Sequence, residues 1–376
     1  MDAPRHVVLL GATGSIGQST LAVIRRHPEQ FRLAGMAARR NRAALQALSR
    51  EFEGSRTCLF EESGMEGLLE LATLPEADVV VVATTGTTGI LPTIAALEAG
   101  KTVALANKEA LVYAGQFVMA AARHGAGTLL PADSEHNAIF QCLDGMRDPR
   151  HLERIILTAS GGPFLHHTRS ELAAVTVEQA LKHPNWEMGD KVTLDSATLA
   201  NKGLEIIEAH WLFNLPADRI EVVIHPQSLI HSMVEFRDGS LLAQLAPASM
   251  TFPLQHALTY PDKLDPTVSR LNLGLIRQLE LRPPDMDKFP CLRLAREALE
   301  AGGMAPAFYN TANEVAGQAF LEKSIPFLAI PKLIEHCMNR LELAGPSSLD
   351  ELLGREAEIR AFARKAASNQ AAAPIL

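Results

Sequence analysis

The chain has 376 residues, a formal net charge of −8 and 47% hydrophobic residues, so it is long enough for two or three domains with cores of their own. The negative charge argues against a nucleic-acid-binding surface, which requires a basic stripe. No run approaches the roughly 20 apolar residues of a membrane span, and no apolar signal segment begins the chain. Four separated cysteines without a CxxC pair favour reduced thiols, so we expect a cytoplasmic protein.

The first predicted strand, residues 6–10, runs into a glycine-rich turn, Gly11-Ala12-Thr13-Gly14-Ser15-Ile16-Gly17, and a helical pattern follows. A dinucleotide-binding loop requires this context of strand, turn and helix, because glycines let the backbone approach a pyrophosphate and the helix N-terminus offers N–H groups to it. The GxxGxxG spacing occurs in several NADP-linked families, and a plain βα turn is the alternative.

The second predicted strand, residues 31–38, ends at Arg39-Arg40-Asn41. NAD sites usually have an acidic residue at this position to hold the ribose 2′-hydroxyl. Cations suit a 2′-phosphate instead, so the sequence predicts NADPH over NADH. The alternative is two solvated arginines on a surface turn.

Three further predicted strands, residues 78–83, 102–106 and 127–131, alternate with helical patterns, as in a parallel sheet buried on both faces. Polar clusters follow two of them, Asn107-Lys108-Glu109 and Asp133-Ser134-Glu135-His136-Asn137. Ligands bind beyond the carboxyl ends of the strands in open α/β sheets. We therefore expect these clusters and the glycine turn to share one site.

The next segment reads as a second domain with a different sheet. Strand 154–159 leads into Ser160-Gly161-Gly162, which could form a backbone nest for an oxyanion, or only a flexible turn. Segment 182–189 holds Trp186 without periodicity, which suits either a lid over a ligand or a core anchor. The predicted strands 220–224, 229–236 and 241–245 suggest an antiparallel layer that could pack against a second copy.

One stretch, residues 194–210, combines polar side chains with a helical pattern. We expect Ser196 to cap this helix, and Asn201 and Glu205 to share one face with Lys202 beside them. An amide, an ammonium, a hydroxyl and a carboxylate near a helix start suit an anionic ligand and a cation. The alternative is a solvated helix face.

The chain beyond residue 259 changes character. Residues 259–284 read as an extended connector, and the helical patterns at 292–300, 311–320, 327–343 and 349–363 predict a small bundle. We interpret its polar residues Asn313, Glu314 and His336 as core or solvated groups and give the bundle a scaffolding role. The Ala-rich tail, residues 368–376, is expected to be disordered.

The predicted fold is α/β with three domains: a Rossmann-like doubly wound parallel sheet (1–131), a central α+β catalytic domain (132–262), and a C-terminal helical bundle (289–376) after a linker (263–288). Asp133, Glu135 and Glu205 offer oxygen ligands, which favour Mg²⁺ or Mn²⁺ over zinc. Lys108, near the same strand ends, and the donors around Ser160 and Ser196 suit a phosphorylated ligand. These observations predict a metal-assisted reductase of a sugar phosphate.

Several long motifs resemble the 1-deoxy-D-xylulose 5-phosphate reductoisomerase family of the non-mevalonate isoprenoid pathway over nearly the whole chain. They are GATGSIG from Gly11, ANKEALV from Ala106, ADSEHNAIFQ from Ala132, ASGGPF from Ala159, KHPNWEMG from Lys182, DSATLANKGLEIIEAHWLF from Asp195 and HPQSLIHSMVEF from His225. The resemblance implies conversion of that sugar phosphate to 2-C-methyl-D-erythritol 4-phosphate with NADPH and Mn²⁺ or Mg²⁺. It also implies a homodimer in a bacterial cytoplasm.

The resemblance also implies roles for single residues. The cofactor would be bound by Thr13, Gly14, Ser15, Ile16, Arg39, Arg40, Asn41, Asn107, Glu109 and Gly189. The metal ligands would be Asp133, Glu135 and Glu205. The substrate would contact Lys108, Ser134, Glu135, Ser160, His183, Trp186, Ser196, Asn201, Lys202 and Glu205. The catalytic groups would be Lys108, Glu135, His183 and His231, with Trp186 and Met188 on a mobile flap.

The chain departs from the family pattern at Ala12, Arg39 and Glu187, where Ser, Gly, and Ser or Lys are usual. Two other functions stay open at this point. A different NADP-linked reductase with a GATG loop, such as a semialdehyde dehydrogenase, would need a cysteine nucleophile, and Cys142 lies in a helical run that suits one poorly. A non-catalytic NADPH-binding protein would bind the cofactor without oxidising it.

Overall fold

The computed structural model describes residues 3–146, 148–186, 188–339, 345–346 and 348–372. The chain divides into two compact units. Unit 1 comprises Met1–Leu111, Gly115–Gly145 and Gln244–Asn272, and unit 2 comprises Val112–Ala114, Met146–Ala243 and Leu273–Leu376. The predicted boundaries of three domains stay a prediction.

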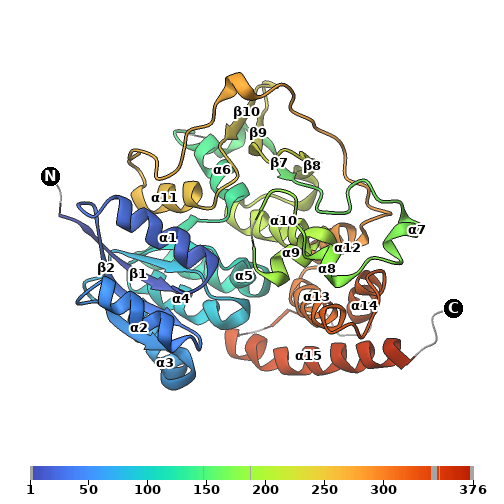
Figure 1. The fold of residues 1–376 in the computed structure, drawn as a ribbon, viewed down its shortest axis with the longest axis horizontal. Helices are drawn as coiled ribbons and strands as arrows, with labels where there is room; N and C mark the ends of the chain where they lie inside the picture. Colours follow the sequence, from blue (N-terminus) through green and yellow to red (C-terminus); the bar gives the residue numbers. More distant parts are fainter. Residues whose placement is uncertain (1–2, 147, 187, 340–344, 347, 373–376) are drawn as a thin grey trace. The chain divides into compact units, whose positions relative to one another are not determined.

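Unit 1 is built on a six-stranded parallel sheet with the order β3-β2-β1-β4-β5-β6 (Figure 1). The order reverses between β1 and β4, and the crevice beyond the carboxyl ends at such a point is the usual ligand site. The strands are β1 (Arg5–Leu10), β2 (Phe31–Ala38), β3 (Arg56–Leu59), β4 (Val79–Val82), β5 (Thr102–Leu105) and β6 (Thr128–Pro131). The sequence prediction missed only β3 among them.

Helices cover both faces of this sheet, as in a doubly wound fold. Val7 and Leu9 face one buried cluster with side chains of α1 (Ser15–Arg26), α2 (Arg42–Glu51) and α11 (Thr251–Thr259). Successive strand residues point to opposite faces, and on the other face α3 packs on β1 and β2 while α4 packs on β4 and β5. The remaining helices of unit 1 each follow a strand of the sheet in the chain. They are α3 (Phe60–Ala72), η1 (Gly86–Gly89), α4 (Ile90–Glu98), α5 (Lys108–His124) and α6 (Ser134–Leu143).

Unit 2 contains a four-stranded sheet with the order β10-β9-β7-β8. Its strands are β7 (Leu152–Ala159), β8 (Ile220–Ile224), β9 (Ile230–Phe236) and β10 (Leu241–Leu245). The expectation of an antiparallel layer was wrong for one pair, because β7 and β8 are parallel while β7 and β9 are antiparallel. A helical crossover separates β7 from β8 in the chain, and such a crossover permits parallel pairing.

Helices make up the rest of unit 2. Most of α10 (Ala200–Phe213) is buried, and it packs against α12 (Pro290–Ala301). A side chain at Gly203 would come within 2.6 Å of the Ala295 side chain, so this glycine permits the close packing. The other helices are η2 (Pro149–His151), α7 (Arg169–Leu172), α8 (Val177–Ala180), α9 (Asp190–Ala197), η3 (Ala217–Arg219), η4 (Leu273–Leu275), α13 (Ala305–Leu321), α14 (Ala329–Met338) and α15 (Leu349–Ala372).

Two local predictions were wrong. Ser196 does not cap a helix, because it lies inside α9. The next helix starts after Leu199, whose φ of 59° is left-handed and separates α9 from α10. Thr198 Oγ1 accepts a hydrogen bond from the Ala200 N–H at 3.3 Å. The Ala-rich tail is helical through Ala372, in keeping with the high helix propensity of alanine; its last four residues lie outside the described part of the chain.

Candidate active site

The glycine turn after β1 is shaped by two close backbone approaches. Gly11 has a φ of +104°, and a Cβ there would lie 2.4 Å from the Ala83 carbonyl oxygen. A Cβ on Gly17 would lie 2.4 Å from the Gly11 carbonyl oxygen, so Gly17 lets α1 start directly against the turn. Gly14 is different, because it is exposed and a Cβ there would meet nothing nearer than 3.5 Å. Its open side is where a pyrophosphate can approach the N-terminus of α1.

The other predicted residues of this turn leave its surface polar. Thr13 is half-buried and Ser15 is exposed, whereas Ile16 packs against the core cluster of unit 1. At the end of β2, Arg39 and Arg40 are exposed. Asn41 caps α2, since its side-chain oxygen accepts from the Ala44 N–H at 3.1 Å.

Asn107 holds the start of α5 to the segment after β4. Its Oδ1 accepts from the Ala110 N–H at 3.1 Å, and its Nδ2 donates to the carbonyls of Thr84 and Gly86 at 2.8 and 2.9 Å. The same Nδ2 lies 3.2 Å from the Glu109 carboxylate. Asn107 therefore joins the start of α5 to the loop that follows β4.

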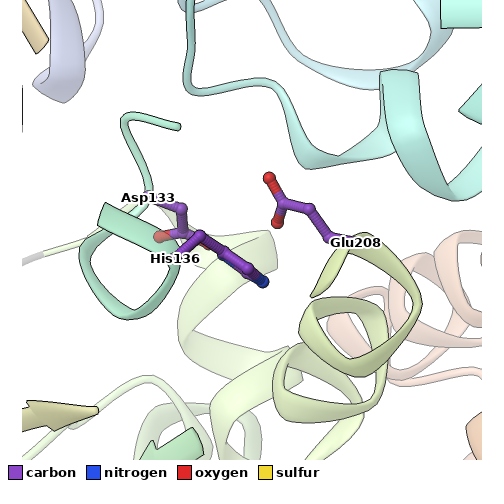
Figure 2. A group of neighbouring side chains, drawn as sticks. All are labelled: Asp133, His136 and Glu208. Atoms are coloured by element: carbon purple, nitrogen blue, oxygen red, sulfur yellow. The ribbon is translucent and has the colours of Figure 1, made fainter. Parts of the chain in front are cut away.

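The acidic cluster after β6 starts α6, and Figure 2 draws Asp133 and His136 there. Asp133 caps the helix by accepting from the Ser134 N–H at 3.0 Å, and its other oxygen accepts from Lys108 Nζ at 2.6 Å. The Ser134 hydroxyl donates to the Glu135 carboxylate. Two carboxylates and one ammonium thus gather at the carboxyl edge of the parallel sheet.

His136 is fully buried, and its Nδ1 lies 3.9 Å from the Asp133 carboxylate. Glu208, which Figure 2 also labels, belongs to α10 of unit 2. Neither residue was assigned a role from the sequence. The position of His136 one helical turn after Asp133 could have indicated that the two side chains lie close together.

In unit 2, Ser160 and His183 form a hydrogen-bonded pair. His183 Nδ1 accepts from the backbone N–H groups of Asn185 and Trp186 at 3.2 and 3.0 Å. The proton of the neutral ring must then be on Nε2, which lies 2.8 Å from Ser160 Oγ. Ser160 Oγ also accepts from the Gly162 N–H at 3.2 Å, so its own hydrogen points to a third group. Burial lowers the pKa of His183 to about 4, which keeps the ring neutral.

The flap segment follows directly. Asn185 Nδ2 donates to the Pro226 carbonyl at 2.5 Å and to the Ser228 hydroxyl at 3.0 Å. The Trp186 ring meets the His231 ring edge-on, with centroids 6.2 Å apart. The flap ends where Gly189 caps α9, and Thr193 Oγ1 donates to the carbonyls of Met188 and Gly189. Glu187 lies outside the described residues.

The start of α10 gathers the remaining predicted residues. Glu205 is only 1% exposed and accepts from the side chains of Asn201 and Lys202. Ser196 lies at the end of α9, and its carbonyl oxygen would be 2.5 Å from a Cβ on Gly162. The Ser160 turn and the end of α9 are therefore adjacent within unit 2.

Within each unit, the structure brings several of the predicted residues into contact. In unit 1, Lys108 pairs with Asp133 and Ser134 with Glu135. In unit 2, four pairings link His183 to Ser160, Trp186 to His231, and Glu205 to Asn201 and Lys202. Sequence reasoning missed Asn185 as a flap contact, although an Asn beside a proline in a loop is a familiar hydrogen-bonding residue.

Family models match most of this chain. The model of 1-deoxy-D-xylulose 5-phosphate reductoisomerase matches residues 7–64 and 60–115. The model of its C-terminal domain matches residues 129–213, and the DXP reductoisomerase C-terminal domain matches residues 245–362. Together they match parts of both units.

Relatives that match over nearly their full length bear the name of the same family. The 1-deoxy-D-xylulose 5-phosphate reductoisomerase of Geobacillus kaustophilus is 50% identical over 381 residues, which cover 96% of this chain and 99% of the relative. That of Acidithiobacillus ferrooxidans is 47% identical over 396 residues, covering 98% and 100%.

Solved structures have the same fold. A DOX-P reductoisomerase in complex with NADPH, fosmidomycin and magnesium has a TM-score of 0.92 at 39% identity, with 96% of this chain and 98% of that chain covered. The Zymomonas mobilis enzyme with NADPH has a TM-score of 0.87 at 40% identity, covering 98% and 100%. These matches confirm the predicted fold class and enzyme class. The chain belongs to the 1-deoxy-D-xylulose 5-phosphate reductoisomerase family.

Proposed function

We propose that the chain catalyses the NADPH- and divalent-cation-dependent rearrangement and reduction of 1-deoxy-D-xylulose 5-phosphate to 2-C-methyl-D-erythritol 4-phosphate, a step toward isoprenoid precursors. One observation carries the proposal. Relatives that bear this name match the chain over its full length at 47 to 50% identity. The glycine turn, the acidic cluster and the polar side chains of unit 2 described above have the chemistry that such a reaction requires.

NADPH fits the glycine turn and the end of β2. The open side of Gly14 admits the pyrophosphate, and the exposed Arg39 and Arg40 suit a 2′-phosphate. We take Asn107 and Glu109, which are hydrogen-bonded to each other at the start of α5, as further cofactor contacts. When bound, NADPH supplies the hydride. Replacing both arginines by alanine should bring the KM values for NADPH and NADH closer together.

A divalent cation fits the acidic cluster. Asp133 already attracts the Lys108 ammonium, and Glu135 lies on the first turn of the same helix. We take Asp133, Glu135 and Glu205 as its ligands, since carboxylate oxygens are what Mg²⁺ and Mn²⁺ prefer. When bound, the cation acts as a Lewis acid that polarises the substrate's ketone and hydroxyl oxygens.

The substrate's phosphate fits the donors of unit 2. Ser160, Ser196, Asn201 and Lys202 offer hydroxyl, amide and ammonium hydrogens, and the neutral His183 orients the Ser160 hydroxyl by donating to its oxygen. Binding the phosphate away from the reacting carbons orients the sugar. The buried Lys202 has its charge balanced by Glu205.

The remaining groups handle protons and water. We take Lys108 and Glu135 as the groups that exchange protons with the substrate's hydroxyl groups, and Ser134 donates a hydrogen bond to the Glu135 carboxylate. Trp186, backed by His231, would close over the sugar and keep water from the intermediate.

A homodimer is the assembly that we propose. The sheet of unit 2 has one covered edge, because Arg282 forms a bridge with Ile224 of β8. At the other edge, β10 exposes Leu241 and Leu242 by 47% and 49%. An apolar edge strand of this kind is normally paired or covered, and a second copy would supply the matching strand.

For the location of the protein we propose the cytoplasm, where the four cysteines, all free thiols in the structure, would stay reduced. None of the helices in the described part of the chain combines the length and the apolar character that a membrane crossing requires.

The rival reductase with a cysteine nucleophile is disfavoured. Cys142 lies inside α6, and burial raises the pKa of its thiol to about 11. A thiol with a raised pKa provides little thiolate at neutral pH. Replacing Cys142 by alanine should therefore leave turnover intact.

Turnover and its metal dependence test the proposed function. NADPH absorbance is followed with 1-deoxy-D-xylulose 5-phosphate before chelation, after chelation, and after addition of Mg²⁺ or Mn²⁺. We expect chelation to abolish turnover and either ion to restore it. Asp133→Asn should lower turnover about a hundredfold or more. Asp148→Asn, at a half-buried helix cap paired with Arg150, should not. Full activity after chelation would contradict the metal role.

A further inference from the structure

A buried carboxylate links the phosphate-binding segment of unit 2 to the C-terminal helices. Asp195, in α9, is 3% exposed. One of its oxygens accepts from Asn313 Nδ2 of α13 at 2.8 Å, and the other accepts from Lys191 Nζ at 3.0 Å. Asn313 is itself 2% exposed, so both partners have left water to make this bond.

This contact is specific rather than general packing. A buried carboxylate and a buried amide each carry a large cost unless they are hydrogen-bonded, and a bond to a charged group is about twice as strong as a neutral one. A second contact lies one turn further along α13, where a Cβ on Gly317 would be only 3.3 Å from the Leu194 side chain. Together these contacts fix α9 against α13.

The position of α9 determines the position of the phosphate donors. Ser196 directly follows Asp195, and its carbonyl lies against the Gly162 turn that carries Ser160. The chain then turns at Leu199 into α10, whose first residues are Asn201 and Lys202. A shift of α9 would therefore displace donors on both sides of the proposed phosphate site.

We propose that Asn313, acting through Asp195, is a positioning residue for the substrate's phosphate group. The inference rests on the proposed function, since the donors of unit 2 hold that phosphate. It gives the C-terminal helices a part in substrate binding, beyond the scaffolding role that the sequence suggested for them.

Asn313→Ala tests this against a matched control in the same helix. Asn310 lies one turn earlier in α13, is equally buried, and its amide contacts Glu314 rather than α9. We expect Asn313→Ala to raise the KM for 1-deoxy-D-xylulose 5-phosphate about tenfold or more, with kcat within about twofold, and Asn310→Ala to leave both constants near those of the wild type. Equal rises in KM for the two variants would overturn the proposal.

A charge exchange separates positioning from folding. Asn313→Asp places two carboxylates together and should raise KM further. Combining it with Asp195→Asn restores a carboxylate–amide pair with the partners exchanged, and KM should return to within about threefold of the wild type. If the double variant recovers its thermal stability but not its KM, the bond serves folding alone and the proposal fails.

Inorganic phosphate provides a readout that does not depend on turnover. Its dissociation constant, measured by calorimetry on the full chain, should rise in Asn313→Ala and stay unchanged in Asn310→Ala. If the wild type fails to convert the sugar phosphate, the proposed function fails, but this comparison still decides whether Asn313 positions an anion site. An unchanged dissociation constant in Asn313→Ala would contradict the positioning role.

Discussion

Gly17→Ala should weaken both the fold and the cofactor site of unit 1. The new Cβ would lie 2.4 Å from the Gly11 carbonyl oxygen and 2.6 Å from that of Ala12. Both are backbone atoms, which cannot rotate away as a side chain can. Alanine favours a helix over glycine by about 1 kcal/mol, but overpacking costs about 1–3 kcal/mol and more where backbone must move. We therefore expect a net loss of roughly 1–2 kcal/mol in the free energy of unfolding.

Gly14→Ala is the matched substitution in the same turn. Gly14 has a φ of −83°, which alanine adopts freely, and its nearest neighbour would be 3.5 Å away. Stability should stay within about 0.5 kcal/mol of the wild type, while the methyl group blocks the side from which a pyrophosphate approaches. Urea denaturation and an NADPH fluorescence titration measure the two effects. The reasoning is refuted if Gly17→Ala unfolds no more easily than the wild type, or if Gly14→Ala keeps full affinity for NADPH.

Three further results are expected. Asn107→Ala removes the hydrogen bonds that join the start of α5 to the loop after β4. It should lower the free energy of unfolding by about 1–3 kcal/mol and raise the KM for NADPH. An unchanged free energy of unfolding in urea denaturation would contradict this. The pKa of His183 is lowered to about 4, below its unfolded value of about 6.5. The stability that the neutral ring contributes is thus present above pH ~6.5 and lost as the pH falls toward 4. The NMR signals of the His183 ring should not titrate between about pH 7 and 5. A titration midpoint near pH ~6.5 would show that the ring is not held neutral. Leu242→Lys, on the exposed edge strand β10, should shift sedimentation from dimer to monomer, and an unchanged dimer would exclude that edge as the interface.

Much of unit 1 could be predicted because its signals are local. The apolar run of β4, Val79–Val82, is buried throughout, which is why it reads as a central parallel strand. The polar clusters around Lys108 and Asp133 follow strands directly, and parallel strands bring such clusters to one edge. The glycine turn was recognised because its context of strand and helix is contiguous in the chain.

The parts that could not be predicted depend on long-range contacts. The parallel pairing of β7 with β8 joins segments more than 60 residues apart, and the residues of one strand do not show which distant strand it pairs with. The bond between Asp195 and Asn313 spans 118 residues, so no local pattern could identify the partner of Asn313. Ser196 resembled a helix cap because no sequence pattern shows that the chain turns three residues later, at Leu199. Leu199 adopts the αL conformation, which is rare for leucine.

The most direct test of the central claim is isotope transfer. Enzyme with its divalent cation is given 1-deoxy-D-xylulose 5-phosphate and NADPH carrying deuterium at the hydride position, and the product is examined by mass spectrometry and NMR. The account predicts 2-C-methyl-D-erythritol 4-phosphate with one deuterium on the newly reduced carbon, formed in a 1:1 ratio to NADPH consumed. A product without deuterium, or one with the original unbranched carbon skeleton, would contradict it.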